Sequence, residues 1–247
     1  MYKDFAYVYD SLTDDVNYTI WANYIVELFE RFECKPEIVL DMGCGTGSLT
    51  VELANRGFDM IGLDASADML AVAEGKSKAA GKNVLFVNQD MCHLDLFGTV
   101  GAVISTLDSM NYLKSIRCLK KVCALVHNYL DDDGLFVFDV HSKYKMEKIF
   151  ANNVFHVVND DLTYIWECSY DGRRKVCGHD MTFFLNTGEL YQRFDEFHEE
   201  RFFSKEEIEG ALAEAGLKVM NVYDGATFRK TTPKSERWLY VCKKVRV

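Results

Sequence analysis

The chain has 247 residues, 49% of them hydrophobic, and a formal net charge of −10. That length and apolar content can bury a sizeable core, which excludes a disordered chain. The acidic balance disfavours nucleic acid as the main partner, because contacts with phosphates depend on Lys and Arg.

Eight cysteines are scattered along the chain, with no CxxC pair and no Cys/His cluster at metal-ligand spacing. We therefore expect reduced thiols and no metal site. The first residues, "MYKDFAYVYD", place acids and tyrosines where a signal peptide would have an apolar core. No run approaches the roughly 20 apolar residues of a membrane span. The sequence thus predicts a cytoplasmic protein without a membrane partner.

The first part of the chain alternates strand-like and helical segments, which is typical of parallel βαβ units. An amphipathic helix over residues 17–33 comes first, with one apolar face formed by Ile20, Tyr24, Ile25, Leu28, Phe29 and Phe32. Five strands are predicted at residues 37–42, 59–64, 84–90, 100–108 and 134–140. Helices are predicted at residues 47–56, from Ser66 onward, and at residues 113–130. The pattern predicts a doubly wound α/β sheet.

The pattern changes after His141. Residues 153–202 carry β-branched and aromatic runs separated by "NDD", "DGRR" and "NTGE", which predicts an inserted antiparallel β lid. A helix from Ser204 to Ala215 and strands at 217–224 and 237–244 then resume the α/β pattern. We expect three parts: residues 1–141 as an N-terminal cap and ligand-binding core, 142–202 as the lid, and 203–247 completing the core.

A glycine-rich segment, "VLDMGCGTGSLT" at residues 39–50, follows the first predicted strand. Gly43, Gly45 and Gly47 allow a sharp turn, close approach of a ligand and tight packing of the next helix. A dinucleotide fingerprint G-x-G-x-x-G fails here, because its third glycine would fall on Ser48. Asp41 would repel a pyrophosphate but suits a positive ammonium or sulfonium. Both features weaken the interpretation as a nicotinamide-dependent oxidoreductase.

"VLDMGCGTG" resembles the cofactor motif of class I S-adenosylmethionine-dependent methyltransferases, and the similarity extends over most of the chain. It implies a Rossmann-like seven-stranded sheet whose last strand is antiparallel. It also implies that Asp64, followed by Ala65, binds the ribose hydroxyls, and that Asp90 binds the adenine amino group beside Met91. Leu107 and Asp108, in "STLDSMNYL", would lie beside the methionine part of the cofactor and the acceptor.

The start "YKDFAYVYDSLTDDVNYTIWANYI" and the late "SERWLYVCKK" resemble a branch of small bacterial methyltransferases with a tyrosine-rich N-terminus and an antiparallel lid. In that branch the N-terminal tyrosines cover the cofactor. The resemblance carries this role to Tyr9, and more weakly to Tyr2, Tyr7 and Trp21.

Each assignment has an alternative. Asp64 could cap the helix that begins near Ser66, and Asp95 competes with Asp90 for the adenine. The tyrosines could be aromatics that pack on the first helix.

Three residues are candidates for a general base, which methyl transfer needs only if the acceptor enters protonated. They are His198 on a predicted lid strand, His141 just past the fifth strand, and Asp108. Glu196 and Arg201 are candidates for binding a polar substrate.

The sequence predicts a methyltransferase that transfers the methyl group of S-adenosylmethionine to a nitrogen or oxygen of a small molecule by in-line displacement. One alternative is a methyltransferase of tRNA or protein; against tRNA, acids outnumber Lys and Arg over residues 153–202. The other is a binding module that senses S-adenosylmethionine or S-adenosylhomocysteine without catalysis. The lid strands could equally serve a homodimer contact.

Overall fold

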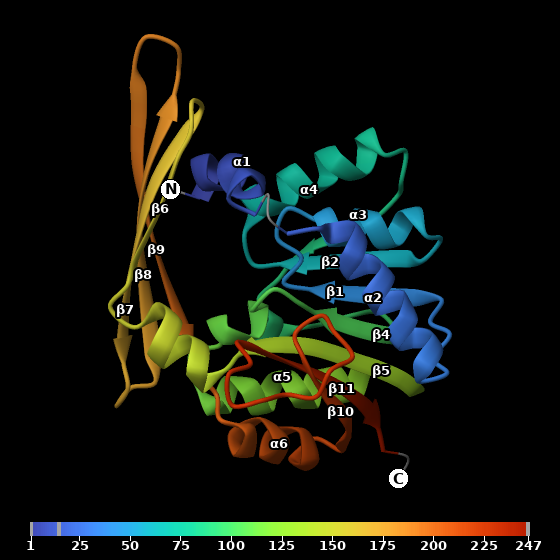
Figure 1. The fold of residues 1–247 in the computed structure, drawn as a ribbon. Coiled ribbons are helices and arrows are strands. Elements are labelled where there is room, and N and C mark those ends of the chain that lie inside the picture. Colours follow the sequence, from blue (N-terminus) through green and yellow to red (C-terminus); the bar gives the residue numbers. More distant parts are fainter. Residues whose placement is uncertain (1, 14–15, 246–247) are drawn as a thin grey trace.

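The structure is a computed structural model that describes residues 2–13 and 16–245, without the side chains of residues 2–4, 7 and 11. The expected roles of the Tyr2 and Tyr7 side chains therefore lie outside the described residues. Two sheets organise the chain (Figure 1). In the described part of the chain, no helix combines the length and the apolar character that crossing a membrane requires.

The larger sheet has seven strands in the order β10-β11-β5-β4-β1-β2-β3. Their bounds are β1 Ile38–Met42, β2 Asp59–Asp64, β3 Leu85–Asn88, β4 Val100–Ser105, β5 Leu130–His141, β10 Leu217–Asp224 and β11 Arg237–Lys244. The pairs among β1 to β5 are parallel, whereas β11 is antiparallel to both β5 and β10. The predicted Rossmann-like seven-stranded sheet, with an antiparallel last strand, is confirmed.

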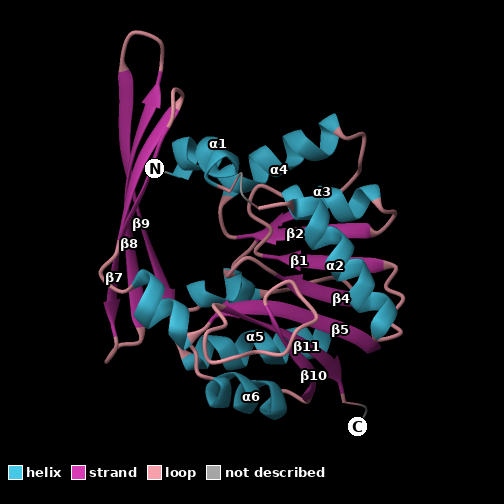
Figure 2. Ribbon diagram, viewed as in Figure 1, coloured by secondary structure: helices cyan, strands magenta, loops and turns pink. Residues whose placement is uncertain are grey.

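Helices cover both faces of this sheet (Figure 2). Their bounds are α1 Tyr2–Leu12, α2 Tyr18–Arg31, α3 Ser48–Asn55, α4 Ala67–Ala79, α5 Ile116–Tyr129 and α6 Lys205–Glu214, with short turns η1 Met91–His93, η2 Ser109–Tyr112 and η3 Lys145–Phe150. One core lies between the sheet and helices α2 and α3, and another between the sheet and helices α5 and α6.

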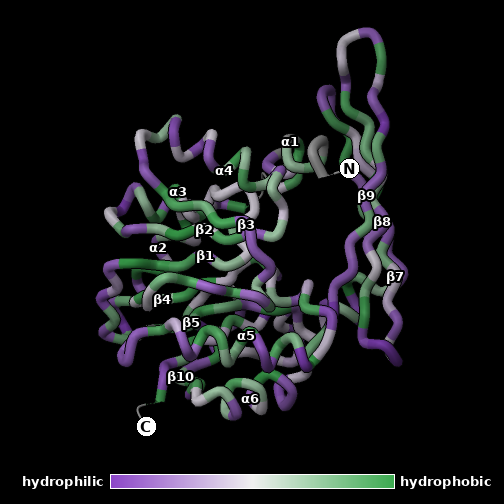
Figure 3. Tube along the Cα trace, turned by 180° about the vertical axis from the view of Figure 1, so that it is seen from behind, coloured by the Kyte–Doolittle hydropathy of each residue, from purple (hydrophilic) through white to green (hydrophobic). Residues whose placement is uncertain are grey.

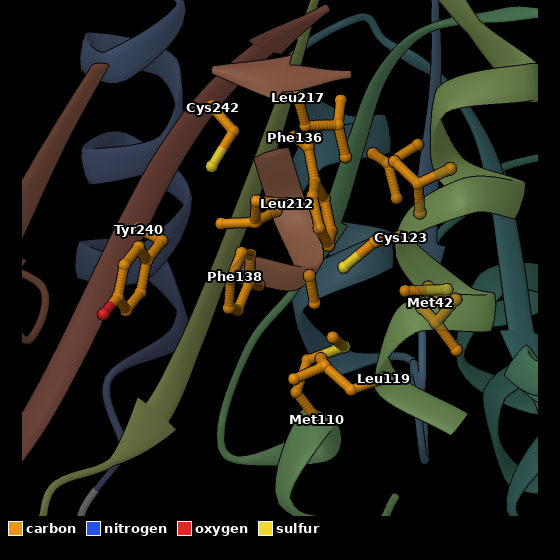
Figure 4. Close-up of a cluster of buried hydrophobic side chains, with 14 of the residues drawn as sticks. Met42, Met110, Leu119, Cys123, Phe136, Phe138, Leu212, Leu217, Tyr240 and Cys242 are labelled. Atoms are coloured by element: carbon orange, nitrogen blue, oxygen red, sulfur yellow. The ribbon is translucent and has the colours of Figure 1, made fainter. Parts of the chain in front are cut away.

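The side chains of strand β5 alternate between the two cores. Leu135 and Val137 join the α2/α3 core, while Phe136 and Phe138 point to the other face. Phe136 stacks on Phe138, with ring centroids 4.7 Å apart, and Phe138 stacks on Tyr240 of β11 at 5.1 Å (Figure 4). Because both faces are buried, the strand reads as a continuous apolar run.

The predicted end of helix 113–130 differs from the structure. We expected "DDDG" at residues 131–134 to close the helix before a strand beginning at Gly134. The helix ends at Tyr129, and β5 begins at Leu130, so the three aspartates are the exposed start of a longer strand. Their charges are solvated there, and the strand propensity of the segment is set by its pairing with β4.

The second sheet, here called the lid sheet, is antiparallel with the order β6-β7-β8-β9. Its strands are β6 Val154–Val158, β7 Leu162–Asp171, β8 Val176–Asn186 and β9 Tyr191–Arg201. Figure 1 shows it standing across the carboxyl ends of the central strands. Figure 3 shows mixed hydropathy along β8 and β9, whereas β1 is mostly hydrophobic. Along β9, buried and exposed residues alternate from Asp195 to Glu200, so this part of the lid sheet has one buried and one solvent-exposed face.

Helix α1 bridges the two sheets. Phe5, Ala6 and Val8 are buried in one cluster with Met69 of α4 and with Leu162 and Phe183 of the lid sheet. The N-terminal helix is thus held between the lid sheet and the α/β core, above the carboxyl end of β2.

Candidate functional site

The glycine loop, residues 43–47, joins β1 to α3. All three glycines have positive φ: 81° at Gly43, 53° at Gly45 and 72° at Gly47. A Cβ on Gly43 would lie 2.7 Å from the Ser109 side chain, and one on Gly47 would lie 2.7 Å from Cβ of Ala73. A Cβ on Gly45 would meet nothing within 4 Å. Gly43 and Gly47 therefore serve packing, and Gly45 is the glycine that faces open space.

Asp64 ends β2 and supports this loop. Its carboxylate accepts hydrogen bonds from Gly45 N at 2.9 Å and from Ser66 N at 2.8 Å. The cap of α4 is Ser66, whose hydroxyl accepts a hydrogen bond from Met69 N. Burial raises the pKa of Asp64, while the backbone donors oppose that shift. The residue that caps α4 is therefore Ser66 and not Asp64, although Asp64 accepts a hydrogen bond from the backbone N–H of Ser66. The Asp64 carboxylate lies at the edge of the sheet, where β2 ends.

Asp90 and Met91 follow β3 at the same edge. Asp90 accepts a hydrogen bond from Cys92 N at 2.7 Å, and 57% of its side chain is exposed. Met91 Cε lies 3.5 Å from the position of a Cβ on Gly43. Asp95, the competing acid, instead accepts a hydrogen bond from Tyr129 of α5. Asp90 therefore lies two residues beyond the end of β3, whose last residue, Asn88, pairs with Asp64 at the end of β2. Ala65, the residue after Asp64, is exposed.

A pocket, here called the loop pocket, lies between the glycine loop and the exit of β4. Its lining includes Tyr9, Tyr18, Asp41, Gly45, Thr106 and Leu107. Asp41 is buried and accepts a hydrogen bond from Thr50 Oγ1 at 2.6 Å. Burial raises the pKa of Asp41 to about 7. A cation next to this carboxyl would stabilise its ionised form.

Two aromatic residues of the N-terminal segment line the loop pocket. Tyr9 was predicted there, and Tyr18, the first residue of α2, was missed. Trp21, which was assigned weakly, instead packs on the α2/α3 core. Tyr18 donates a hydrogen bond from its hydroxyl to Thr13 Oγ1 at 3.2 Å, and no sequence motif indicated that it would line the pocket.

The exit of β4 is strained. Leu107 and Asp108 are consecutive residues in the left-handed region, with φ of 55° and 63°. Such conformations cost about 1–3 kcal/mol each and cluster at functional sites. Asp108 is held by Arg237, whose Nη2 lies 2.7 Å from its Oδ1, and Asp139 accepts a hydrogen bond from Asp108 N. Arg237 also pairs with Asp139.

His141 and Glu200 complete a charge cluster with these three residues. His141 Nε2 lies 3.2 Å from Glu200 Oε2 and 3.6 Å from Asp108 Oδ2. Burial alone would raise the pKa of Asp108, but Arg237 and His141 hold it well below its ordinary value. Burial likewise opposes ionisation of Glu200, yet His141 lowers the pKa of that carboxyl to about 2. Burial disfavours the charge on His141, and the two carboxylates more than offset this and raise its pKa.

The cluster is therefore a network of ion pairs. The ligating atoms of Asp108, His141 and Glu200 lie within 4.8 Å of one another, as in a metal site. Its carboxylates already face Arg237 and a His141 whose raised pKa favours the imidazolium. We predict that the cluster works without a metal ion.

Strand β9 places a polar row on the buried face of the lid sheet. Glu196, His198 and Glu200 are buried, and the residues between them are exposed. His198 packs between Phe5 and Tyr112, with ring centroids 4.9 and 5.9 Å away. Burial lowers the pKa of His198. Sequence reasoning named Glu196 and His198 but missed Glu200, although its spacing of two from His198 put it on the same face.

Two further residues of the lid sheet, Trp166 and His179, lie near Glu200. Trp166 Nε1 donates a hydrogen bond to His179 Nδ1 at 3.0 Å. The proton of a neutral His179 is therefore on Nε2, which lies 3.5 Å from Glu200 Oε2. Trp166 and His179 thus orient a donor toward Glu200 from β7 and β8.

Known proteins resemble this chain over most of its length. The methyltransferase domain family matches residues 39–134. YqeM of Bacillus subtilis (strain 168), which is named as a methyltransferase, is 35% identical over 246 residues, covering 99% of this chain and 97% of that protein. An S-adenosylmethionine-dependent methyltransferase from Clostridium acetobutylicum ATCC 824 is 32% identical, with a TM-score of 0.92 over 99% of both chains. The sugar N-methyltransferase KedS8 from Streptoalloteichus sp ATCC 53650 has a TM-score of 0.83 at 20% identity, covering 97% of this chain and 93% of that one, and shares the fold.

Proposed function

Because the chain belongs to the class I S-adenosylmethionine-dependent methyltransferases, we propose that it methylates a nitrogen or oxygen of a small molecule bound beneath the lid sheet. The observation that carries the proposal is the row Glu196, His198 and Glu200 on β9, whose side chains are buried. The contacts of His198 with Phe5 and Tyr112 place this row beside α1 and the exit of β4.

The residues present fit S-adenosylmethionine. Gly45 faces open space, and Asp64 presents a carboxylate at the end of β2 for the ribose hydroxyls. Asp90 and Met91 would hold the adenine, and Asp41 with Tyr9 would hold the amino-acid end in the loop pocket. When bound, the cofactor supplies an electrophilic methyl group on a sulfonium.

The protein's part in the reaction is orientation, closure and control of one proton. Tyr9, Tyr18 and Leu107 line the loop pocket, and apolar and aromatic walls of this kind favour exclusion of water and alignment of the reacting atoms. The lowered pKa of His198 leaves its imidazole neutral at neutral pH, so it can take a proton from the acceptor. His141 is held as an ion-pair partner by Asp108 and Glu200. We therefore favour His198 as the base over His141 and Asp108.

An amine is the acceptor that this pocket suits best. Glu196 and Glu200 flank His198, and carboxylates attract an ammonium before its proton is removed. The similarity in fold to a sugar N-methyltransferase agrees with an amine carried on a small polar molecule. The same acids disfavour the tRNA alternative, because they would repel a phosphate backbone.

The test is a methyl-transfer screen read by mass spectrometry. Purified protein and S-adenosylmethionine are incubated with panels of small amines, small alcohols, a tRNA pool and a peptide mixture. We expect a gain of one methyl group on an amine, with loss of activity in His198→Gln. Methylation of tRNA or peptide alone would overturn the proposal.

A further inference from the structure

A second cavity, here called the edge pocket, lies at the carboxyl edge of the sheet and apart from the glycine loop. It has a volume of about 340 Å³. Four segments form it: the residues after β5, the first residue of α6, the loop from β10 to β11, and Trp238 near the start of β11. Its polar lining consists of Ser142, Lys143, Tyr144, Lys205, Thr231, Thr232 and Ser235, and among the described residues no acid lines it. The cavity therefore offers ammonium and hydroxyl groups without a carboxylate.

Lys205 is aimed across this cavity. Its Nζ donates a hydrogen bond to Thr231 Oγ1 at 3.2 Å and lies 4.9 Å from the centroid of the Trp238 ring. Among the described residues, no carboxylate forms an ion pair with it. Neither the Thr231 hydroxyl nor the Trp238 ring neutralises the charge of Lys205, which remains available to an anion although it also acts on the exposed carboxylate of Glu206.

The hydroxyl groups are held in a fixed turn. Thr232 N donates to Ser235 Oγ at 2.8 Å, and Ser235 N donates to Thr232 O at 3.1 Å. On the opposite wall, Ser142 Oγ accepts a hydrogen bond from Lys145 N. A hydroxyl that accepts from the backbone still has one proton to donate, which suits an oxyanion with several acceptor oxygens.

The local charge also departs from that of the whole chain. The loop from residue 225 to 236 carries Arg229, Lys230 and Lys234 against the single acid Glu236. Residues 143–148 carry three lysines and one glutamate. In a chain of net charge −10, this is a positive region that attracts anions.

From these observations we propose that the edge pocket is a binding site for a phosphate group carried by a small molecule. The site is distinct from the loop pocket, but it adjoins the charge cluster through the chain. Ser142 follows His141, and Trp238 follows Arg237, at the point where β5 and β11 pair. Successive side chains of a strand point to opposite faces of the sheet. Trp238, in the edge pocket, therefore points to the opposite face from Arg237 in the charge cluster, and the two sites are neighbours along the chain.

The test is calorimetry on the full chain with four probes: inorganic phosphate, pyrophosphate, an amino sugar, and the same amino sugar bearing a phosphate. The variants are Lys205→Met and, as a matched control, Lys218→Met on exposed β10. Binding of S-adenosylmethionine is measured in every sample, so that failure of the cofactor assignment is seen separately.

We expect at least one phosphate probe to bind the wild-type chain, more weakly as salt is raised. Lys205→Met should weaken that binding about tenfold or more, and Lys218→Met should leave it unchanged. Tighter binding of the phosphorylated amino sugar than of pyrophosphate would identify an organic phosphate as the ligand, and the reverse would identify free phosphate. No binding of any phosphate probe, or equal binding to Lys205→Met, would overturn the proposal.

Discussion

Asp10 of α1 forms an ion pair with Lys76 of α4, with Oδ2 and Nζ 2.6 Å apart. The pair also contacts the glycine loop and the start of α3: Asp10 Oδ1 accepts from Thr46 Oγ1 at 2.7 Å, and Lys76 donates to Ser48 Oγ at 2.6 Å. The N-terminal helix is thus tied to the loop expected to hold the cofactor, in addition to its apolar contact with the lid sheet. Movement of α1 away from the glycine loop and release of the cofactor should therefore be linked.

The first prediction concerns the ion pair between Asp10 and Lys76. Asp10→Asn should speed dissociation of S-adenosylhomocysteine a few-fold, because a partly exposed ion pair contributes only about 0.5–1 kcal/mol. Stopped-flow fluorescence of the protein with the ligand measures the rate. Lys78→Met, on the exposed side of the same helix as Lys76, is the control. An unchanged rate in Asp10→Asn would show that α1 does not retain the ligand.

The second prediction concerns Asp64. Asp64→Ala should weaken binding of S-adenosylmethionine by about 1–3 kcal/mol, through lost hydrogen bonds to a charged group. Calorimetry gives the affinity, and Asp59→Ala, at the exposed opposite end of β2, should bind like the wild type. Equal affinities for the two variants would remove Asp64 from the ribose site.

The third prediction is a pH dependence caused by Asp41. Its pKa of about 7 means that the carboxyl is mostly protonated at pH 6 and mostly ionised at pH 8. Only the ionised form attracts the ammonium of the cofactor. That attraction should make the affinity of the wild-type chain fall about tenfold from pH 8 to pH 6, relative to Asp41→Asn.

Calorimetry in two buffers of different ionisation enthalpy checks this, since binding at pH 6 should also release a proton from Asp41. The amino group of the ligand titrates near pH 8 with either protein, so the comparison with Asp41→Asn isolates the side chain. Parallel pH profiles for both proteins would contradict the prediction.

The fold could be predicted from sequence because its signals are local. The strand-end acids Asp64 and Asp90 follow short apolar runs, and the parallel arrangement brings such ends to one edge. The lid could be predicted for the same reason, since β-branched runs broken by "NDD" and "NTGE" indicate hairpins.

The charge cluster could not be predicted, because its members come from distant segments. Asp108 and Arg237 are 129 positions apart, and Glu200 reaches His141 only because the lid sheet stands against β5. Sequence gives the faces of strands but not which faces meet. His141 was therefore considered as a base, without the carboxylates that bind its imidazole.

The fourth prediction separates the two histidines. His198→Gln should lower the rate of methyl transfer to an amine about 10²–10⁴-fold and remove the fall of kcat at low pH, because the neutral imidazole would no longer be needed. His156→Gln, on β6, is the control. If the fall at low pH survived in His198→Gln, another group would be the base.

The last prediction concerns the stability that Glu200 gives the lid sheet. Its pKa in the folded chain is about 2, below the ordinary 4.5 of a glutamate, because His141 favours the charged form. A lowered pKa means that the stabilisation is complete above about pH 4.5 and is lost as pH falls toward 2. Glu200→Gln should therefore lower the free energy of unfolding by about 3 kcal/mol at pH 7, since it leaves a buried His141 with one carboxylate fewer. Urea unfolding followed by circular dichroism at pH 7, 5 and 3 measures the difference from the wild type, which should narrow between pH 5 and pH 3. Glu199→Gln, on the exposed face next to Glu200, should match the wild type throughout. A difference that stays constant from pH 7 to pH 3 would mean that Glu200 stabilises the fold through packing. Its ion pair with His141 would then not contribute to holding the lid sheet against β5.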